Sequence, residues 1–288
     1  MQLTLSRDVA VQVIKYWLTR YRKMAGKSQT DAATEVGAKQ PTIAGYENGK
    51  HLPSQLHLKA LLEFYGRGDQ VAELSAVRDV AARRGDRTEG VPISTVESIG
   101  LRYGLESFAV SIEEYMIDVV SGLLQTEDYA RANITTYADL MPVADAERSL
   151  RTRMDRQEVL RRDSGETPLE LTMYVEEHVL WRPIGGPEVH GTQLDHLLDA
   201  SRLKNVTVRV VPQSVGYHAA LRSTFSLMSF GDERRVAYAE DFQSAHYYDS
   251  PAALETAARL MSHLHHVALD QSQSRRLISE IRKESAAT

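Results

Sequence analysis

The sequence predicts a mainly α-helical chain whose second domain is of the α+β class. Segments with helical spacing of apolar residues fill the first 80 or so residues, whereas strand-like alternation is concentrated in residues 169–240. Between them, residues 83–100 (RRGDRTEGVPISTVESIG) follow neither period and contain three glycines and a proline. A length of 288 residues suits two domains. We therefore expect a first domain at 1–82, a linker at 83–100 and a second domain at 101–288.

The first domain is expected to contain five helices. Residues 8–25 have apolar side chains at helical spacing and basic residues in the last turns, where cations suit the helix dipole. Ser28 is a good N-cap for a second helix over 29–36, which Gly37 ends. The other three helices are expected at about 40–48, 54–65 and 69–84.

The second domain is expected to place helices around a small antiparallel sheet. Four runs alternate as strands do, at 169–175, 206–212, 223–230 and 234–240. Residues 111–125 look partly extended. Helices are expected at 126–140, 145–163, 187–202, 251–268 and 271–285.

Composition excludes several classes of function and places a positive charge at the front of the chain. The absence of cysteine excludes disulfides, zinc ribbons and thiol catalysis. Residues 1–66 carry six Lys and three Arg against two Asp and three Glu, a net charge of +4. Residues 67–90 are neutral and the whole chain is −5, so residues 91–288 carry −9. A basic N-terminal segment followed by an acidic remainder suggests local contact with nucleic acid. Without an evident signal peptide or membrane span, we expect a cytoplasmic protein.

The segment 29–50 has the spacing of a helix-turn-helix. Counted from Gln29 as position one, such a unit needs a small residue at position five and a glycine with positive φ at position nine. Ala33 and Gly37 occupy these places. Five further positions must be apolar to close the unit, and they hold Ala32, Val36, Ala38, Ile43 and Tyr46. A plain bundle of short helices would not need these matches, so the spacing favours a DNA-binding unit.

Six residues are the candidate DNA contacts. The helix expected at 40–48 would enter the major groove by its N-terminal end, where Lys39, Gln40 and Thr42 point outwards. Gln40 can pair with an adenine edge, Lys39 with guanine or phosphate, and the Thr42 methyl group with thymine. The remaining candidates should contact the DNA backbone, and they are Gln29, Asn48 and Lys50. Pro41 costs little in a first turn, while Gly45 leaves the middle of this face without a side chain.

The segment "ENGK" at 47–50, which follows the helix-turn-helix and precedes Leu52 and Pro53, resembles the lambda-repressor-like, or Xre-type, class.

The runs "GLLQTEDYAR" at 122–131 and "RPIGGPEV" at 182–189 resemble the WhiJ-like regulators of actinobacteria. That resemblance covers nearly the whole chain. It implies an Xre-type DNA-binding domain, an antitoxin-like C-terminal domain and a small partner protein that binds the latter. It also implies a transcription regulator, and modules of this kind bind as homodimers on paired half-sites.

The sequence departs from that family at several positions. Ser121 stands where the family usually has Pro before "GLLQT". The family's linker commonly carries a Trp pair, where this chain has "GDRTEG". Lys39 replaces the usual Ser or Thr helix cap, and Gly45 often corresponds to Arg. The last two differences concern the sequence specificity of DNA binding rather than the way the domain docks.

Two other functions compete with a signal-receiving regulator. One is an antitoxin-like adaptor that mainly binds protein, with DNA binding as feedback. The other is a small-molecule receptor with an aromatic pocket formed by Tyr217, His218, Phe242, His246, Tyr247 and Tyr248.

An enzyme is the least favoured class, and neither cofactor nor metal is expected. The sequence contains no P-loop and no GxGxxG. His263 and His266 have the helical spacing of a metal pair but lack an obvious third ligand. The run Glu176-Glu177-His178 lacks the HExxH order and suits a polar helix start.

Overall fold

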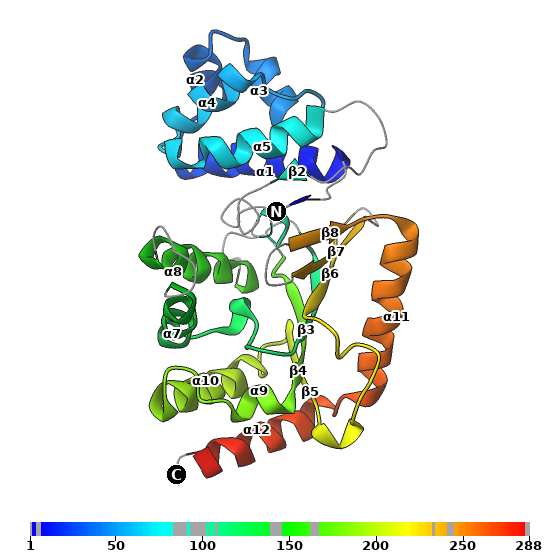
Figure 1. The fold of residues 1–288 in the computed structure, drawn as a ribbon. Coiled ribbons are helices and arrows are strands. Elements are labelled where there is room, and N and C mark those ends of the chain that lie inside the picture. The colour runs from blue at the N-terminus through cyan, green and yellow to red at the C-terminus, as the bar shows by residue number, and fades with distance from the viewer. Residues whose placement is uncertain are drawn as a thin grey trace. The chain divides into compact units, whose positions relative to one another are not determined.

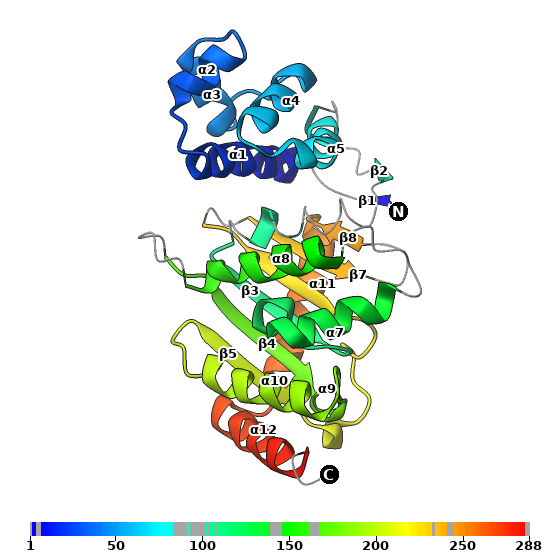
Figure 2. The ribbon, with the colours of Figure 1, turned by 90° about the vertical axis from the view of Figure 1, so that its left-hand side faces the viewer.

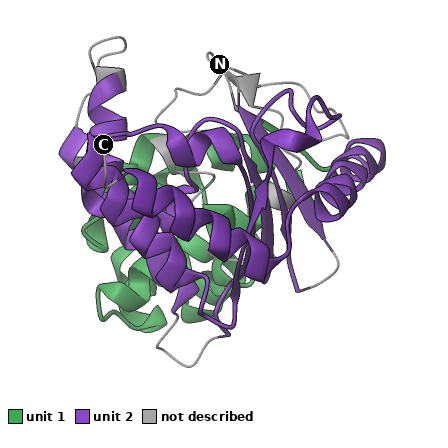
Figure 3. Ribbon diagram, turned by 90° about the horizontal axis from the view of Figure 1, so that it is seen from below, with its two compact units in different colours: residues 1–108, 241–249 green, residues 109–240, 250–288 purple. Residues whose placement is uncertain are grey.

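The computed structural model describes residues 2–3, 7–82, 91–92, 102, 104–106, 109–138, 146–161, 167–231, 234–240 and 245–285. The chain divides into two compact units, residues 1–108 with 241–249 and residues 109–240 with 250–288 (Figure 3). The linker expected at 83–100 lies outside the described residues except for Val91–Pro92. Among the helices described, none has both the length and the apolar character needed to cross a membrane.

The first unit contains a bundle of five short helices (Figure 1). These are α1 (Arg7–Met24), α2 (Gln29–Glu35), α3 (Gln40–Glu47), α4 (Gln55–Phe64) and α5 (Val71–Ala82), with a 3-10 turn, η1 (Gly68–Gln70), before the last. Two short strands, β1 (Gln2–Leu3) and β2 (Val91–Pro92), pair antiparallel. The five expected helices are thus confirmed, with boundaries that differ by at most two residues.

Local sequence explains where these helices begin and turn. The Ser28 hydroxyl accepts the backbone N–H of Asp31, whose carboxylate in turn accepts the Ser28 N–H, so α2 starts with a capping box. Ser54 caps α4 in the same way through the N–H of His57. Gly37 has a φ of +62°, as expected for position nine of the motif. The core beneath is formed by Val13, Ile14, Leu18, Ala32, Ile43, Leu58, Leu61, Leu62 and Leu74.

The second unit is an α+β structure built on one sheet, as the sequence predicts. Its strands are β3 (Ser111–Met116), β4 (Glu170–Glu176), β5 (Val206–Val211), β6 (Phe225–Ser229) and β7 (Arg235–Glu240). The sheet order also includes β8 (Ala245–Tyr248), whose residues are counted with the first unit. Its helices are α7 (Glu127–Ala138), α8 (Ala146–Asp155), α9 (Glu177–Trp181), α10 (Pro187–Ala200), α11 (Pro251–Val267) and α12 (Gln271–Ser285). Short 3-10 turns lie at η2 (Gly122–Leu124), η3 (Arg156–Leu160) and η4 (Gln213–Val215).

The sheet is mixed, so the expectation of an antiparallel sheet was wrong in this respect. Its order is β5-β4-β3-β6-β7-β8, in which β3, β4 and β5 run parallel while β6 pairs antiparallel with β3 and with β7. Parallel neighbours need crossover connections, and here helices α7 to α10 supply them between successive strands. The alternation of single strands does not show which strands pair, because the pairing depends on these longer connections.

Helices cover both faces of this sheet. Figures 1 and 2 show α7, α8 and α10 on one face of the strands and α11 on the other. The core under α11 joins aromatic side chains of the sheet to the helix, with Tyr115, Tyr174 and Phe225 packed near Met261 and Leu264. The outer edge of β5 is covered at the corner between α11 and α12, where Val210 donates to the Ser274 hydroxyl and accepts the N–H of Leu269. Such covering blocks further strand pairing there.

Candidate nucleic-acid interface

The N-terminal end of α3 is the exposed part of the helix-turn-helix. Lys39 precedes the helix in an extended conformation and makes no side-chain cap bond, as its poor capping chemistry predicts. Pro41 falls in the first turn, where its missing N–H has no intrahelical partner to lose. The side chains of Lys39, Gln40 and Pro41 are exposed, whereas Ile43 and Tyr46 are buried on the opposite face. The end of the helix is therefore free to approach a ligand.

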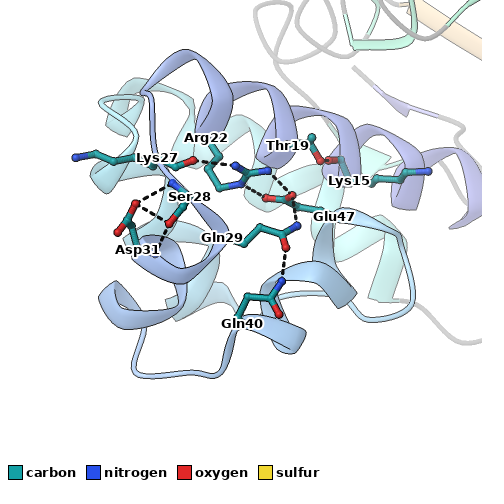
Figure 4. Close-up of polar contacts among 9 residues, drawn as sticks. All are labelled: Lys15, Thr19, Arg22, Lys27, Ser28, Gln29, Asp31, Gln40 and Glu47. Carbon is teal, nitrogen blue, oxygen red and sulfur yellow. Dashed lines mark hydrogen bonds and ion pairs between the residues drawn. The ribbon is translucent and has the colours of Figure 1, made fainter.

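A chain of hydrogen bonds runs from this exposed end into the core (Figure 4). The Gln40 amide donates to Gln29 Oε1 over 2.5 Å, and the Gln29 amide donates to Glu47 Oε2 over 2.8 Å. Arg22 on α1 closes the chain, donating from Nε and Nη2 to the two carboxylate oxygens of Glu47 over 2.6 and 2.8 Å. Arg22 Nη1 donates to the backbone carbonyl of Lys27 at 2.8 Å. Helices α1, α2 and α3 are thus fixed to one another through a single carboxylate.

Electrostatics favour this arrangement. The hydrogen bond to Glu47 raises the pKa of Arg22 further above its ordinary value, despite the opposing effect of burial. Glu47 is 9% exposed, so its charge would be costly without the guanidinium. Burial raises the pKa of the neighbouring Tyr65 hydroxyl strongly, and the negative charge of Glu47 adds to this effect. The cluster therefore contains a close ion pair beside a phenol whose ionisation is disfavoured.

The other candidate contacts lie around the same helix. Thr42 is half-buried, so less of its side chain is presented than the sequence suggests. Asn48 and Lys50 are exposed beyond the C-terminal end of α3, where the Asn48 side-chain oxygen accepts the backbone N–H of Lys50 at 3.0 Å. The structure brings Gln29 and Gln40 together and leaves Lys39 and Lys50 extended from the two ends of the helix. The hydrogen bonds through Glu47 could not be read from the local sequence pattern.

The sequence suggests that Gly45 leaves the middle of the helix face without a side chain, but the side chain of His51 fills this space. The ring of His51 lies over it, and a Cβ built at Gly45 would be 2.8 Å from His51 Cδ2. The backbone N–H of His51 also donates to the Gly45 carbonyl over 3.2 Å. Gly45 is consequently buried although it lies away from the core, while His51 is exposed. Sequence reasoning missed His51 because it follows the helix rather than belonging to it.

In the second unit, the run "GLLQT" at 122–126 is held by a side chain of α10. Gln193 on α10 accepts the backbone N–H of Thr126 at 2.7 Å and donates to the carbonyl of Leu124 at 2.7 Å. Gln125 donates to the Val120 carbonyl at 2.8 Å. Ser121 donates its hydroxyl hydrogen to the buried carboxylate of Glu114 while also accepting the N–H of Leu123. These bonds account for "GLLQT" as a structural motif that fixes a turn against α10.

A buried polar cluster lies where β3 and β4 end, beneath α11. Tyr115 donates its hydroxyl to Glu176 Oε1 at 2.6 Å, and His218 Nε2 lies 3.1 Å from the same oxygen. The ring centroids of His218 and His263 are 5.7 Å apart. His218 Nδ1 and His263 Nε2 are buried without a hydrogen-bond partner among the described residues. Burial, together with the bond to Glu176, raises the pKa of Tyr115 well above its usual range.

The other histidines considered from sequence have separate surroundings. His265 Nδ1 lies 2.9 Å from Arg209 Nη1, and His266 Nδ1 lies 2.6 Å from the carbonyl of Ser262. His178 Nε2 lies 2.8 Å from the carbonyl of Ile117. Within the described ranges, no three His, Asp or Glu side chains have the geometry of a metal site.

The aromatic residues proposed for a receptor pocket are dispersed in sequence position and environment. Tyr217 is 80% exposed and His218 is buried. His246, Tyr247 and Tyr248 belong to β8, and Phe242 lies outside the described residues. Among the described members, only His218 takes part in the buried cluster with Glu176.

Two protein families match separate parts of the chain. Residues 18–69 match the family described as helix-turn-helix, and residues 102–280 match a domain of unknown function, DUF5753. The first match supports DNA binding by the first unit. No characterised protein and no solved structure matches the chain.

Proposed function

The chain belongs to the DUF5753 family, since that domain spans more than half of its length, and from its second match, to the helix-turn-helix family at residues 18–69, we propose that it is a sequence-specific transcription regulator. The observation that carries the proposal is the Gln40–Gln29–Glu47 chain of hydrogen bonds, which holds the exposed end of α3 in one position. A base-reading side chain that is held in place before binding loses less entropy on DNA.

Each candidate contact has a separate role in this proposal. Gln40 pairs with an adenine edge, Lys39 with guanine or a phosphate, and the Thr42 methyl group with thymine. Gln29 holds Gln40 through a hydrogen bond and contacts a phosphate. Phosphate contacts of this kind position the protein, while base contacts such as that of Gln40 give specificity. Asn48 and Lys50 contact the backbone on the other side of the groove.

The test is binding of the full-length protein to the DNA that flanks its own gene. Fluorescence anisotropy should give a dissociation constant at least a hundredfold lower for that DNA than for a scrambled duplex, at a fixed salt concentration of about 0.15 M. Equal affinity for both duplexes would contradict sequence-specific regulation.

We further propose that the regulator acts as a homodimer. A single short helix such as α3 contacts few base pairs, so useful specificity requires two half-sites. Sedimentation of the protein with DNA containing one or two half-sites tests this. Two protein chains on the paired site and one on the single site are expected, whereas one chain on both would contradict the proposal.

The second unit is proposed to receive a signal, most simply by binding a small partner protein. The resemblance to WhiJ-like regulators supports this proposal, and so does the presence of a separate core in this unit. Co-expression with the product of a small neighbouring gene, followed by size-exclusion chromatography, is the test. A stable complex that leaves the protein off its DNA would favour the antitoxin-like alternative, in which protein binding is the main activity.

A small-molecule receptor is the second candidate, favoured by the buried nitrogens of His218 and His263 that have no hydrogen-bond partner in the described part of the chain. A polar ligand that donates or accepts hydrogen bonds would satisfy them. Thermal shift assays with small polar metabolites test this candidate. Stabilisation that disappears in His218→Phe would support it, and no stabilisation by any compound would contradict it.

A further inference from the structure

The outer face of α3, away from the core, has a glycine, Gly45, near its centre. Ile43, Tyr46 and Glu47 form the buried side of this helix, and at 100° per residue Gly45 falls on the opposite side. It lies between Pro41 and Asn48 on the face that a groove-binding helix turns towards DNA. A glycine there contributes no side chain of its own.

The chain returns to this place directly after the helix. Gly49 has a φ of +78°, a left-handed conformation that reverses the chain beyond Asn48. The reversal lets His51 donate its backbone N–H to the carbonyl of Gly45 over 3.2 Å. As a result, a residue outside the helix is fixed above its central turn.

The imidazole fills the space that a side chain at position 45 would use. A Cβ at Gly45 would lie 2.8 Å from His51 Cδ2 and 3.8 Å from His51 Nε2, the first of which is closer than real contacts allow. Glycine at this position is therefore what allows the ring to lie against the backbone of α3. His51 is nevertheless an exposed residue.

We propose that His51 is a base-contacting, specificity-determining residue of the DNA interface, held in position by Gly45. An imidazole N–H at the centre of this face can donate to the acceptors that guanine presents in the major groove, N7 and O6. The inference rests on the proposed function, because it assumes that this face of α3 enters the groove. It adds a second reading position above Gly45, about 1.4 turns along the helix from Gln40.

The experiment compares His51→Ala with the wild type in the full-length protein. Binding to the duplex selected by the wild type from a random pool should weaken about tenfold or more, as expected for one lost base contact, while binding to random DNA changes less than twofold. His51→Gln, which keeps a donor, should recover part of the loss. Gln70→Ala in η1 is the matched control and should bind both duplexes as the wild type does.

Gly45→Ala tests the positioning separately. The methyl group must displace the ring, so this variant should lose as much affinity for the selected duplex as His51→Ala. The double variant should lose no more than either single one, because both changes remove the same contact. Alanine is the better helix former, so Gly45→Ala in the His51→Ala background should raise the melting temperature.

The outcomes separate this inference from the function on which it rests. If the wild type selects no duplex, the proposed function fails. If the wild type is specific but His51→Ala weakens selected and random DNA equally, His51 contacts only the phosphate backbone and the inference is wrong. A double variant that binds more weakly than His51→Ala alone would show that Gly45 does not act through His51, which also overturns the inference.

Discussion

Two buried glutamates, one in each unit, are held by different chemistry. Glu47 accepts two hydrogen bonds from the guanidinium of Arg22 and one from the amide of Gln29. Glu176 accepts the hydroxyl of Tyr115 and lies 3.1 Å from an imidazole nitrogen of His218. The first carboxylate is paired with a guanidinium, whereas the neighbours of the second are a phenol and an imidazole.

The hydrogen bonds of the two clusters also lead to different parts of the molecule, one to the surface and the other to buried imidazole nitrogens. The bonds through Glu47 continue to the exposed Gln40, so the position of a surface side chain depends on a buried ion pair. The cluster around Glu176 ends on two buried imidazole nitrogens without partners among the described residues. The first cluster can therefore organise a surface for recognition, while the second offers buried nitrogens to a polar ligand.

The largest loss of stability is expected when Arg22 is removed from the Arg22–Glu47 ion pair and the carboxylate is left behind. Arg22→Ala leaves the carboxylate of Glu47 buried without its cation, which should destabilise the first unit by about 3–5 kcal/mol. Urea denaturation followed by circular dichroism measures this change. A loss below about 1 kcal/mol would show that the ion pair does not fix the three helices.

A matched pair of apolar substitutions separates stability from recognition. Arg22→Met with Glu47→Leu removes both charges together, so stability should remain close to that of the wild type. The amide of Gln29 then loses its acceptor, and binding to specific DNA should weaken although the domain is folded. Unchanged DNA affinity in this double variant would show that the chain of hydrogen bonds does not position Gln40.

A smaller loss of stability is expected at the turn before α7 in the second unit. Gln193→Leu leaves the N–H of Thr126 and the carbonyl of Leu124 without partners. Each orphaned group costs about 1–3 kcal/mol, and the N–H of the half-buried Thr126 should lie at the lower limit, so a total of about 2–4 kcal/mol is expected by denaturation. The exposed Thr192→Ala on the same helix serves as the control, and an equal effect of the two changes would refute a structural role for the motif.

A pH-dependent effect is expected at Glu113 on β3, a third partly buried carboxylate. Burial raises the pKa of Glu113 above its ordinary value of 4.5, although His265 and Arg235 oppose this. A raised folded-state pKa gives a contribution to stability that is present below 4.5 and lost as the pH rises through the folded value. Glu113→Gln should therefore raise the melting temperature at pH 7 and have little effect below pH ~4.

The control for this experiment is Glu170→Gln, a change at an exposed carboxylate on the neighbouring strand. Its effect on the melting temperature should be small at either pH. If Glu113→Gln lowers the melting temperature at pH 7, the ionised carboxylate is stabilised by its cationic neighbours more than it is penalised by burial, and the pKa argument fails.

The smallest effect is expected at Lys50. As a backbone contact it should bind all sequences alike, so Lys50→Ala should weaken binding to specific and random duplexes by the same factor. The slope of log affinity against log salt should fall by about one. Titration at several salt concentrations measures both quantities, and a loss confined to the specific duplex would place Lys50 at a base instead.

The helix-turn-helix could be predicted from sequence because its requirements are local. The small Ala33, the positive φ of Gly37 and the cap at Ser28 each depend on a few neighbouring residues. The parallel pairing of β3, β4 and β5 could not be predicted, since it depends on connections of many residues. Strand β8 was also missed, as four residues carry too little periodicity.

Side-chain partners were the least accessible part of the site. Arg22 and Glu47 are 25 positions apart, and Glu176 and His218 are 42 apart, so neither pair leaves a local pattern. The role of Gly45 was misjudged because the residue that uses its space, His51, comes from beyond the helix end. The six candidate DNA contacts remain predictions from the motif.

The central claim is that the first turn of α3 reads bases through a side chain positioned from the core. Its most direct test is the dissociation constant of Gln40→Ala, measured by anisotropy on the selected duplex and on random DNA at one salt concentration. The account predicts a loss of roughly 1–3 kcal/mol on the selected duplex and almost none on random DNA. An equal loss on both duplexes would contradict it.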